Sequence, residues 1–183
     1  DQLEPEAQRF LRNVSASTEQ MSQLIDDLLS YSRLERRSLN LMSIPIQPLV
    51  ERILATYHEE IERRQIDIAI ELPFTHVLHD GESLYQALNN LVDNAFKFTR
   101  KGRVTASIDL DDGTGSQAES VEPGRIRLLV RVADTGVGIG PEQQQAIFEP
   151  FGIGENYLTK KYSGAGLGLT IAKRLANLMG GDI

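Results

Sequence analysis

Three polar side chains suited to holding a cation or a phosphate stand on one predicted helix, residues 81–98. Asn90, Asn94 and Lys97 are spaced at i, i+4 and i+7, so a helix places them on one face. Asparagine is a poor helix former, so a helix that also contains Asn89 is expected to present amide oxygens to a ligand. Mg²⁺ takes one or two oxygen ligands from protein when phosphates supply others. The competing interpretation is a solvated polar face, the commonest role of such residues.

Two glycine-rich segments lie downstream of this helix. Asp134 follows a predicted strand, residues 126–133, and precedes Gly136 and Gly138, which permit a tight turn and the close approach of a planar ring. Residues 164–168, Gly-Ala-Gly-Leu-Gly, begin another predicted helix, and the free N–H groups of a helix N-terminus attract phosphate. Each segment alone is a weak signal, because glycine turns are common. The three segments in this order are a strong one.

Together the three segments resemble the N, G1 and G2 boxes of the histidine-kinase ATP-binding domain, a fold shared with gyrase, Hsp90 and MutL. Residues 148–151, Phe-Glu-Pro-Phe, resemble its F box, which anchors an ATP lid that would run to about Ala165. The resemblance implies ATP and Mg²⁺ as cofactors. It makes Asn94 the principal Mg²⁺ ligand, supported by Asn90, and it places Lys97 near the phosphates.

The same resemblance implies the remaining contacts with ATP. The carboxylate of Asp134 would accept a hydrogen bond from the exocyclic amine of adenine, where guanine has a carbonyl oxygen instead. Lysines near the end of the lid could meet phosphate or be merely solvated. The other expected ATP-binding residues are Gly136, Gly138, Ile139, Phe151, Lys160, Lys161, Tyr162, Gly164, Ala165, Gly166, Leu167, Gly168 and Leu169.

Asn90 discriminates between possible reactions. In the gyrase-like relatives the matching position is glutamate, the base that activates water for ATP hydrolysis, and an amide cannot accept that proton at neutral pH. The sequence therefore favours a kinase over an ATPase. The resemblance implies that the γ-phosphoryl group of MgATP passes to a histidine on a dimerisation helix that is missing from this chain. Two alternatives remain: an ATPase or conformational clamp of the gyrase and Hsp90 type, and a non-catalytic nucleotide-binding scaffold.

The first segment is predicted to be a long helix, and its periodicity fits either packing against other helices or an ordinary amphipathic helix lying on the domain. Its apolar positions alternate in steps of four and three from Phe10 to Tyr31, which is a heptad pattern. Residues 21–35 resemble the second helix of the dimerisation and histidine-phosphotransfer domain of sensor kinases. This resemblance implies a homodimer through a helical bundle and a response-regulator receiver domain as partner. We expect residues 1–39 to be this helix and residues 40–183 to be the ATP-binding catalytic domain.

The remaining segments predict an α/β two-layer sandwich with a mixed sheet and helices on one face. Strands are expected at 41–46, 66–70, 77–78, 104–110 and 126–133, and helices at 48–61 and 81–98, the second capped by Asp80. The predicted buried stripe of the second helix comprises Leu84, Leu88, Leu91, Val92 and Ala95. Residues 111–124 are acidic and rich in Gly and Ser, so we expect a hairpin loop.

Composition and the histidines narrow the function. The chain has 183 residues and no cysteine, so thiol chemistry is excluded. Its net charge of −7 disfavours nucleic acid or an anionic membrane surface as its main partner. We expect a location in the bacterial cytoplasm, as the cytoplasmic part of either a membrane-bound or a soluble sensor, with no membrane contact by this fragment. His58, His76 and His79 lack the family's acceptor motif and are not expected to accept phosphate. The resemblance thus covers nearly all of this chain, but these residues lack two parts of the family's kinases: the first helix of the dimerisation domain and the final strands of the catalytic domain.

Overall fold

The computed structural model describes residues 4–34, 38–73, 75–110, 127–151 and 166–183. Contacts divide the chain into two compact units, Leu39–Gly138 and Asp1–Ser38 together with Ile139–Ile183. The second unit groups the C-terminal segment with the first helix, whereas the sequence predicts that this segment belongs with residues 40–138. The division into 1–39 and 40–183 rests on the family's domain order and stays a prediction.

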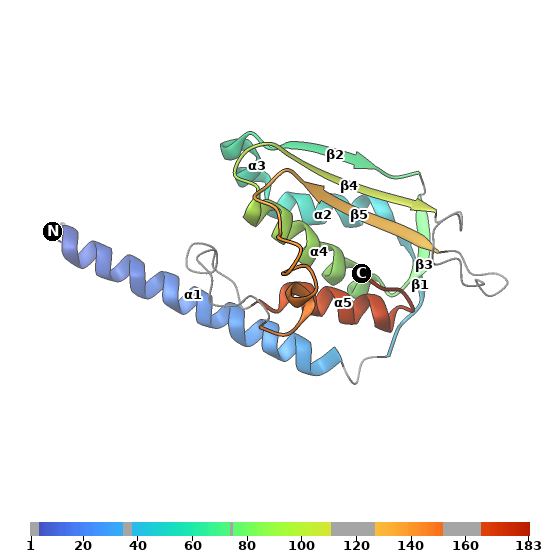
Figure 1. Ribbon diagram of the computed structural model, residues 1–183, viewed down its shortest axis with the longest axis horizontal. Coiled ribbons are helices and arrows are strands. Elements are labelled where there is room, and N and C mark those ends of the chain that lie inside the picture. The colour runs from blue at the N-terminus through green and yellow to red at the C-terminus, as the bar shows by residue number, and fades with distance from the viewer. Residues whose placement is uncertain (1–3, 35–37, 74, 111–126, 152–165) are drawn as a thin grey trace. The chain divides into compact units, whose positions relative to one another are not determined.

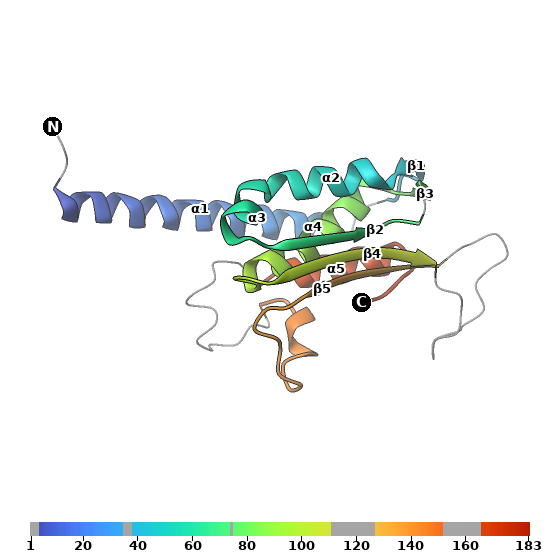
Figure 2. The same cartoon turned by 90° about the horizontal axis from the view of Figure 1, so that it is seen from above.

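The unit Leu39–Gly138 is an α/β sandwich. Its elements are β1 (Met42–Pro45), α2 (Ile46–Thr56), α3 (His58–Arg64), β2 (Asp67–Glu71), β3 (His76–His79), α4 (Gly81–Phe98), β4 (Arg103–Leu110) and β5 (Leu128–Asp134). Strand β4 pairs in parallel with β2 and antiparallel with β5, and β1 pairs antiparallel with β3. Helices α2 and α4 lie on one face of the β2-β4-β5 sheet (Figures 1 and 2). The predicted mixed sheet with helices on one face is confirmed.

Helix α4 begins and packs much as its sequence predicts. The Asp80 carboxylate accepts a hydrogen bond from the Ser83 N–H (2.7 Å), which is the expected N-cap. Leu91 is only half-buried, so its place in the predicted stripe is wrong. The buried residues of α4 are Ser83, Leu84, Ala87, Leu88, Val92, Ala95 and Phe96. The buried apolar face is therefore wider than the sequence suggested, with Ala87 at one edge and Phe96 at the other.

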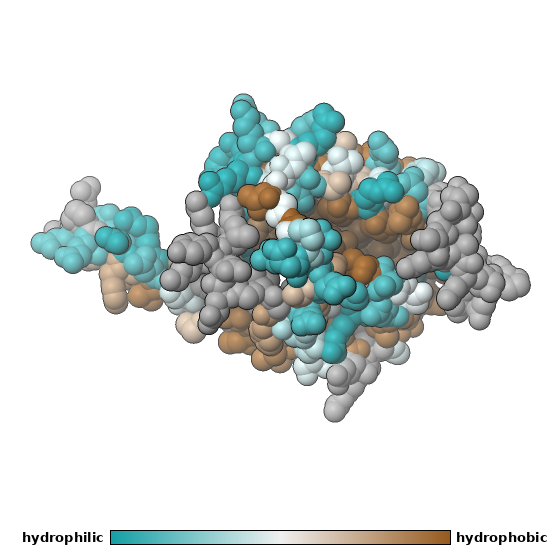
Figure 3. Space-filling model, viewed as in Figure 1, coloured by the Kyte–Doolittle hydropathy of each residue, from teal (hydrophilic) through white to brown (hydrophobic). Residues whose placement is uncertain are grey.

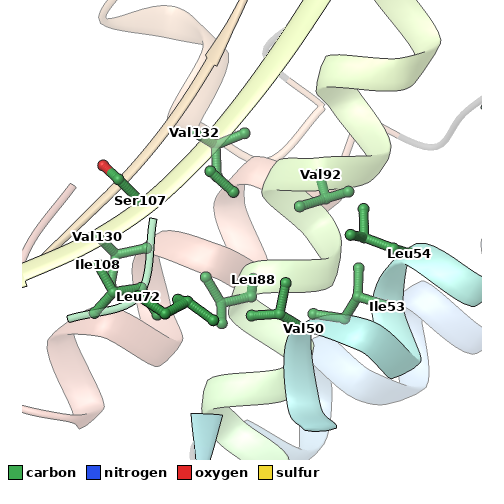
Figure 4. A pocket seen from close by; sticks show the side chains of 11 residues that line it. Val50, Ile53, Leu54, Leu72, Leu88, Val92, Ser107, Ile108, Val130 and Val132 are labelled. Carbon is green, nitrogen blue, oxygen red and sulfur yellow. The ribbon is translucent and has the colours of Figure 1, made fainter. Parts of the chain in front are cut away.

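A small apolar cavity of about 20 Å³ lies between the helices and the sheet of this unit (Figure 4). Its walls come from α2, α4, β4, β5 and the segment after β2. The lining residues are Val50, Ile53, Leu54, Leu72, Leu88, Val92, Ala106, Ser107, Ile108, Val130 and Val132. A void of this size holds about one water, and such a wholly apolar wall gives a water almost nothing to bond. The cavity belongs to the core of the sandwich.

The predicted helix over 48–61 is interrupted at Tyr57. Helix α2 ends at Thr56 and α3 begins at His58, while Tyr57 has φ −106° and ψ 7°. The Tyr57 ring stacks on Phe96 of α4 with centroids 4.8 Å apart, and its hydroxyl donates to Asp93 Oδ1 (3.1 Å). These contacts with α4 overcome the continuous helical spacing of the sequence.

Strand β2 is less evenly buried than its alternating isoleucines predict. Ile66, just before the strand, is 5% exposed, whereas Ile70 is 40% exposed. Among the isoleucines the exposed fraction rises from buried Ile66 through half-buried Ile68 to exposed Ile70, so this face of the strand is covered only near its beginning. Strand β5 follows its prediction better, since Leu128, Val130 and Val132 are all more buried than their neighbours.

The other unit contains helix α1 (Pro5–Leu34), a short 3₁₀ turn η1 (Ala146–Phe148) and helix α5 (Gly168–Leu178). The C-terminal part of α1 contacts α5, where the Arg174 guanidinium lies 4.1 Å from the Tyr31 ring centroid. The predicted apolar stripe of α1 is largely exposed, and apolar side chains show along this helix in Figure 3. Its exposed members are Phe10, Val14, Met21, Leu24, Ile25, Leu28 and Leu29. Across the described residues, no helix combines the length and apolarity needed to cross a membrane.

Candidate functional site

The two asparagines predicted to hold a cation lie one turn apart on α4, and both are half-buried. The amide nitrogen of Asn94 donates to the backbone oxygen of Asn90 (2.8 Å), so the helix uses the nitrogen and leaves Oδ1 as an acceptor. The Asn90 Nδ2 atom is buried and has no hydrogen-bond partner among the described residues. Lys97 follows in the last turn of α4, with Nζ 5.7 Å from the Phe98 ring centroid.

Asp134 is the last residue of β5, and its side chain has a defined orientation although the residue is exposed. One carboxylate oxygen, Oδ1, accepts from the Gly136 N–H (2.7 Å) and from the Thr99 hydroxyl (3.2 Å). Thr99 follows α4 directly, so this bond joins the end of β5 to the end of the asparagine-bearing helix. The other oxygen, Oδ2, has no donor among the described residues and can accept from a ligand.

The turn after Asp134 requires glycine at Gly136 for lack of space. A Cβ atom there would lie 2.5 Å from the Phe98 backbone oxygen and 2.7 Å from Asp134 Oδ1. At Gly138 the reason is conformational, because φ is +72° and an added methyl group would meet nothing within 4 Å. The sequence predicted a tight turn and the close approach of a planar ring. The structure shows the turn, and the close approach at Gly136 is that of the Phe98 backbone.

The remaining described candidates fall in the other unit. Ile139 and Phe151 are exposed, and Phe151 has φ +59°. Gly166 has φ +71°, Leu167 is 1% exposed, and α5 begins at Gly168, with Leu169 half-buried. Outside the described residues lie Lys160, Lys161, Tyr162, Gly164, Ala165 and the predicted lid that contains them.

Two residues that hold the site together were not predicted from the sequence. Thr99 is 0% exposed and donates to Asp134, and the Arg64 guanidinium donates to the backbone oxygens of Phe96 (2.9 Å) and Thr99 (3.2 Å). The available signal was a threonine at the end of a polar helix, but its partner lies 35 residues away. Sequence spacing does not reveal such a contact.

Comparison with known protein families identifies the family to which this chain belongs. The family described as "Histidine kinase-, DNA gyrase B-, and HSP90-like ATPase" matches residues 79–183, which include α4, the Asp134 turn and α5. The chain belongs to this family. Its α/β fold is the ATP-binding fold of histidine-kinase catalytic domains, as the sequence predicted.

Individual relatives agree with the family. Hybrid signal transduction histidine kinase A of Dictyostelium discoideum is 34% identical over 187 residues, which cover 99% of this chain and 9% of the relative. Sensor protein GacS of Pseudomonas syringae pv. syringae is 32% identical over 187 residues, 100% of this chain and 20% of the relative. The chain thus spans a fifth or less of the length of these curated relatives.

Solved structures show the same fold. The structure of full-length ShkA in complex with AMPPNP is similar with a TM-score of 0.72 and 30% identity, covering 98% of this chain and 35% of that one. The histidine kinase ThkA in complex with response regulator protein TrrA is similar in fold, with a TM-score of 0.66 and 21% identity over 98% of this chain and 47% of that one.

The residues present fit a magnesium–nucleotide ligand better than a metal held by protein alone. Among the described residues, no group of three or more His, Cys, Asp or Glu side chains could hold a metal. The two oxygen ligands that the sequence predicts on α4 are the amides of Asn90 and Asn94, a set of the size that Mg²⁺ uses when phosphates complete its coordination.

Proposed function

We propose that this chain binds MgATP and serves as the phosphoryl-donor part of a sensor histidine kinase. The observation that carries the proposal is the joining of two features in one unit: the amide face of α4 and the oriented Asp134 carboxylate that Thr99 links to the end of α4. In the proposal, Asp134 Oδ2 accepts from the adenine amine. Asn94 and Asn90 hold Mg²⁺, which when bound neutralises phosphate charge.

Phosphate contacts are assigned to Lys97 and to the start of α5. Lys97 supplies a cation, and Gly166 and Gly168 flank backbone N–H groups at a helix N-terminus, where the helix dipole favours negative charge. Phosphoryl transfer needs positioning and charge neutralisation more than covalent chemistry from the protein. These side chains and N–H groups are suited to both.

Transfer is favoured over hydrolysis by the chemistry of Asn90. No carboxylate occupies this position on α4, and an amide cannot take a proton from water at neutral pH. The named relatives, which are histidine kinases and sensor proteins, support the same choice. The acceptor would be a histidine on another helix, docked against the exposed apolar stripe of α1.

The biological setting follows from this assignment. The exposed stripe of α1 fits a homodimer through a helical bundle, and the phosphoryl group would pass to the aspartate of a response-regulator receiver domain. ThkA, a relative in fold, is known in complex with a response regulator. We place the activity in the cytoplasm, where ATP and such regulators are found.

The decisive experiment measures binding and transfer separately. The chain is titrated with ATP in Mg²⁺, then incubated with γ-labelled ATP and a separate histidine-bearing helical bundle from a histidine kinase. Asp134→Asn is the matched control, because losing a hydrogen bond to a charged group costs roughly 1.5–3 kcal/mol, about one to two decades in affinity.

We expect wild type to bind ATP, to remain unlabelled alone, and to label the bundle with an acid-labile, base-stable phosphoryl group. Release of free phosphate without labelling would favour the ATPase clamp. Binding without labelling or hydrolysis would favour the scaffold. An unchanged dissociation constant in Asp134→Asn would contradict the adenine assignment, and label on His58, His76 or His79 would contradict the acceptor argument.

A further inference from the structure

Thr99 is fixed through all three of its polar groups at the point where α4 ends. Its N–H donates to the Ala95 oxygen (3.0 Å), its carbonyl accepts from Arg64 (3.2 Å), and its hydroxyl donates to Asp134 Oδ1 (3.2 Å). The residue is 0% exposed, so water does not compete for the hydroxyl. Because Thr99 is buried and held by three hydrogen bonds, its hydroxyl can fix the orientation of the side chain to which it donates.

Asp134 differs from Thr99 in that it lies at the surface, where a carboxylate ordinarily rotates among solvent-bonded orientations. Two donors, the Gly136 N–H and the Thr99 hydroxyl, converge on the same oxygen. One donor leaves the carboxylate free to swing about that bond, whereas two from different segments restrict it. Because the carboxylate is already restricted, a ligand can bind at Oδ2 without the entropic cost of ordering this side chain.

The lengths of the two bonds indicate how the restraint is shared. The bond from Gly136 is short at 2.7 Å, while the one from Thr99 is 3.2 Å, longer than most O–H···O bonds. The Gly136 bond is local to the turn and moves with it. The Thr99 bond is the weaker of the two, but it alone ties the carboxylate to α4 among the described contacts. Its loss should therefore reduce selectivity without abolishing binding.

We propose that Thr99 is a positioning residue that orients the Asp134 carboxylate, and thereby sets the preference of the site for adenine over other bases. The proposal rests on the proposed function, because it takes Asp134 as the adenine contact. It assigns Thr99 no contact with the nucleotide. The bulk of the threonine fills the buried end of α4, and the hydroxyl provides the orientation.

The test separates the hydroxyl from the bulk of the side chain. Thr99→Val keeps the shape and removes the donor, while Thr99→Ser keeps the donor. Ser83→Ala is the matched control, because Ser83 is also 0% exposed, and its hydroxyl has no hydrogen-bond partner among the described residues. Dissociation constants for ATP and GTP are measured by calorimetry for each variant, together with Tm.

We expect Thr99→Val to weaken ATP binding about three- to tenfold and GTP binding less, so that the selectivity ratio falls. Thr99→Ser should restore most of the ratio, and Ser83→Ala should leave it unchanged. In an Asp134→Asn background, Thr99→Val should add almost nothing to the loss of ATP affinity, because both changes act through one carboxylate. Equal losses for ATP and GTP, or full additivity, would overturn the proposal.

A second measurement does not depend on nucleotide binding. In a crystal structure of Thr99→Val without ligand, the Asp134 side chain should occupy more than one orientation, and in Thr99→Ser it should occupy one. An Asp134 carboxylate that stays single and unmoved in Thr99→Val would overturn the proposal even if ATP binds. Failure of wild type to bind ATP would instead contradict the proposed function, and the crystal structures would still decide the orienting role.

Discussion

The backbone oxygen of Phe98 and the α-carbon of Gly136 approach so closely that no side chain fits between them. A Cβ atom at Gly136 would lie 2.5 Å from that oxygen and 2.9 Å from the Phe98 carbonyl carbon. Both obstacles are backbone at the end of α4, so rotating a side chain cannot relieve the clash. The end of α4 and the turn after β5 are thus fitted to each other, and displacing one displaces the other.

Gly136→Ala should therefore lower the affinity for nucleotide by distorting the turn after β5. The methyl group must push the turn away from Phe98 or displace Asp134 Oδ1, which would lie 2.7 Å from it. We expect ATP affinity to fall about tenfold or more, as isothermal titration can measure. The control is Gly180→Ala, where φ is +81° and nothing lies within 4 Å of the added methyl. It should cost about 1–2 kcal/mol of stability through strain and leave affinity intact. Wild-type affinity in Gly136→Ala would refute the close-fit argument.

Asn94→Ala should remove the Mg²⁺ dependence of nucleotide binding and spare the base contacts. The substitution deletes the amide whose nitrogen bonds to Asn90 O and whose oxygen is available to a cation. We expect ATP affinity with and without Mg²⁺ to become nearly equal, while metal-free ADP binding hardly changes. Asn89→Ala makes the same chemical change on the same helix outside the predicted site and should behave as wild type. A wild-type Mg²⁺ response in Asn94→Ala would place the metal elsewhere.

Tyr57 should make stability depend on pH in the alkaline range. Burial, with the nearby Asp93 carboxylate as the next cause, raises the pKa of the Tyr57 phenol well above its ordinary value. The folded state therefore holds this proton more tightly than the unfolded state. The resulting stabilisation is complete below the ordinary tyrosine pKa of about 10 and is lost as pH rises above it.

The measurement is urea unfolding of wild type and Tyr57→Phe from pH 7 to 11. At pH 7 the variant loses the hydrogen bond to Asp93 and should be about 0.5–1.5 kcal/mol less stable. Above pH 10 the stability of wild type should fall more steeply than that of the variant. Parallel curves throughout this range would show that the phenol is not protected.

Arg64→Met should destabilise the unit Leu39–Gly138 by exposing the end of α4. Arg64 forms an ion pair with Glu60 and donates to the backbone oxygens of Phe96 and Thr99, where a cation also complements the helix dipole. Leaving buried acceptors unpaired costs roughly 1–3 kcal/mol. Arg63→Met is the control, because Arg63 pairs with the same Glu60 but is 71% exposed. Exposed pairs contribute about 0–1 kcal/mol, so equal losses in the two variants would refute the capping role.

Local patterns predicted most of the elements, because their causes are local. Asp80 as N-cap, the alternation of β5 and the positive φ at Gly138 all follow from a few neighbouring residues. The break at Tyr57 could not be predicted, since residues 48–61 keep a helical spacing throughout. Its cause is the stacking on Phe96 and the bond to Asp93, both on another helix.

The candidate site shows the same limit. The residues expected to meet the ligand stand in recognisable spacings, so Asn90, Asn94 and Asp134 were selected from the sequence. Thr99 links Asp134 to the end of α4, and Arg64 bonds the backbone there. Their contacts span 35 and at least 32 positions, so sequence spacing gives no signal of them. Burial likewise depends on what covers an element, which is why Leu91 and Ile70 are more exposed than their periodicity suggested.

The central place of β4 has a consequence for how the protein folds. Asp67 and Arg103 are partners in the parallel β2–β4 ladder, yet they lie 36 positions apart in the sequence, with β3 and α4 between them. Non-local pairings of this kind require loop closure, which costs entropy before the stabilising contacts form, and this slows folding. The Asp134 turn follows β5, which pairs with β4, so we expect the candidate site to be completed late in assembly. We expect ATP to slow unfolding while leaving the refolding rate unchanged, since a ligand stabilises only what has already formed.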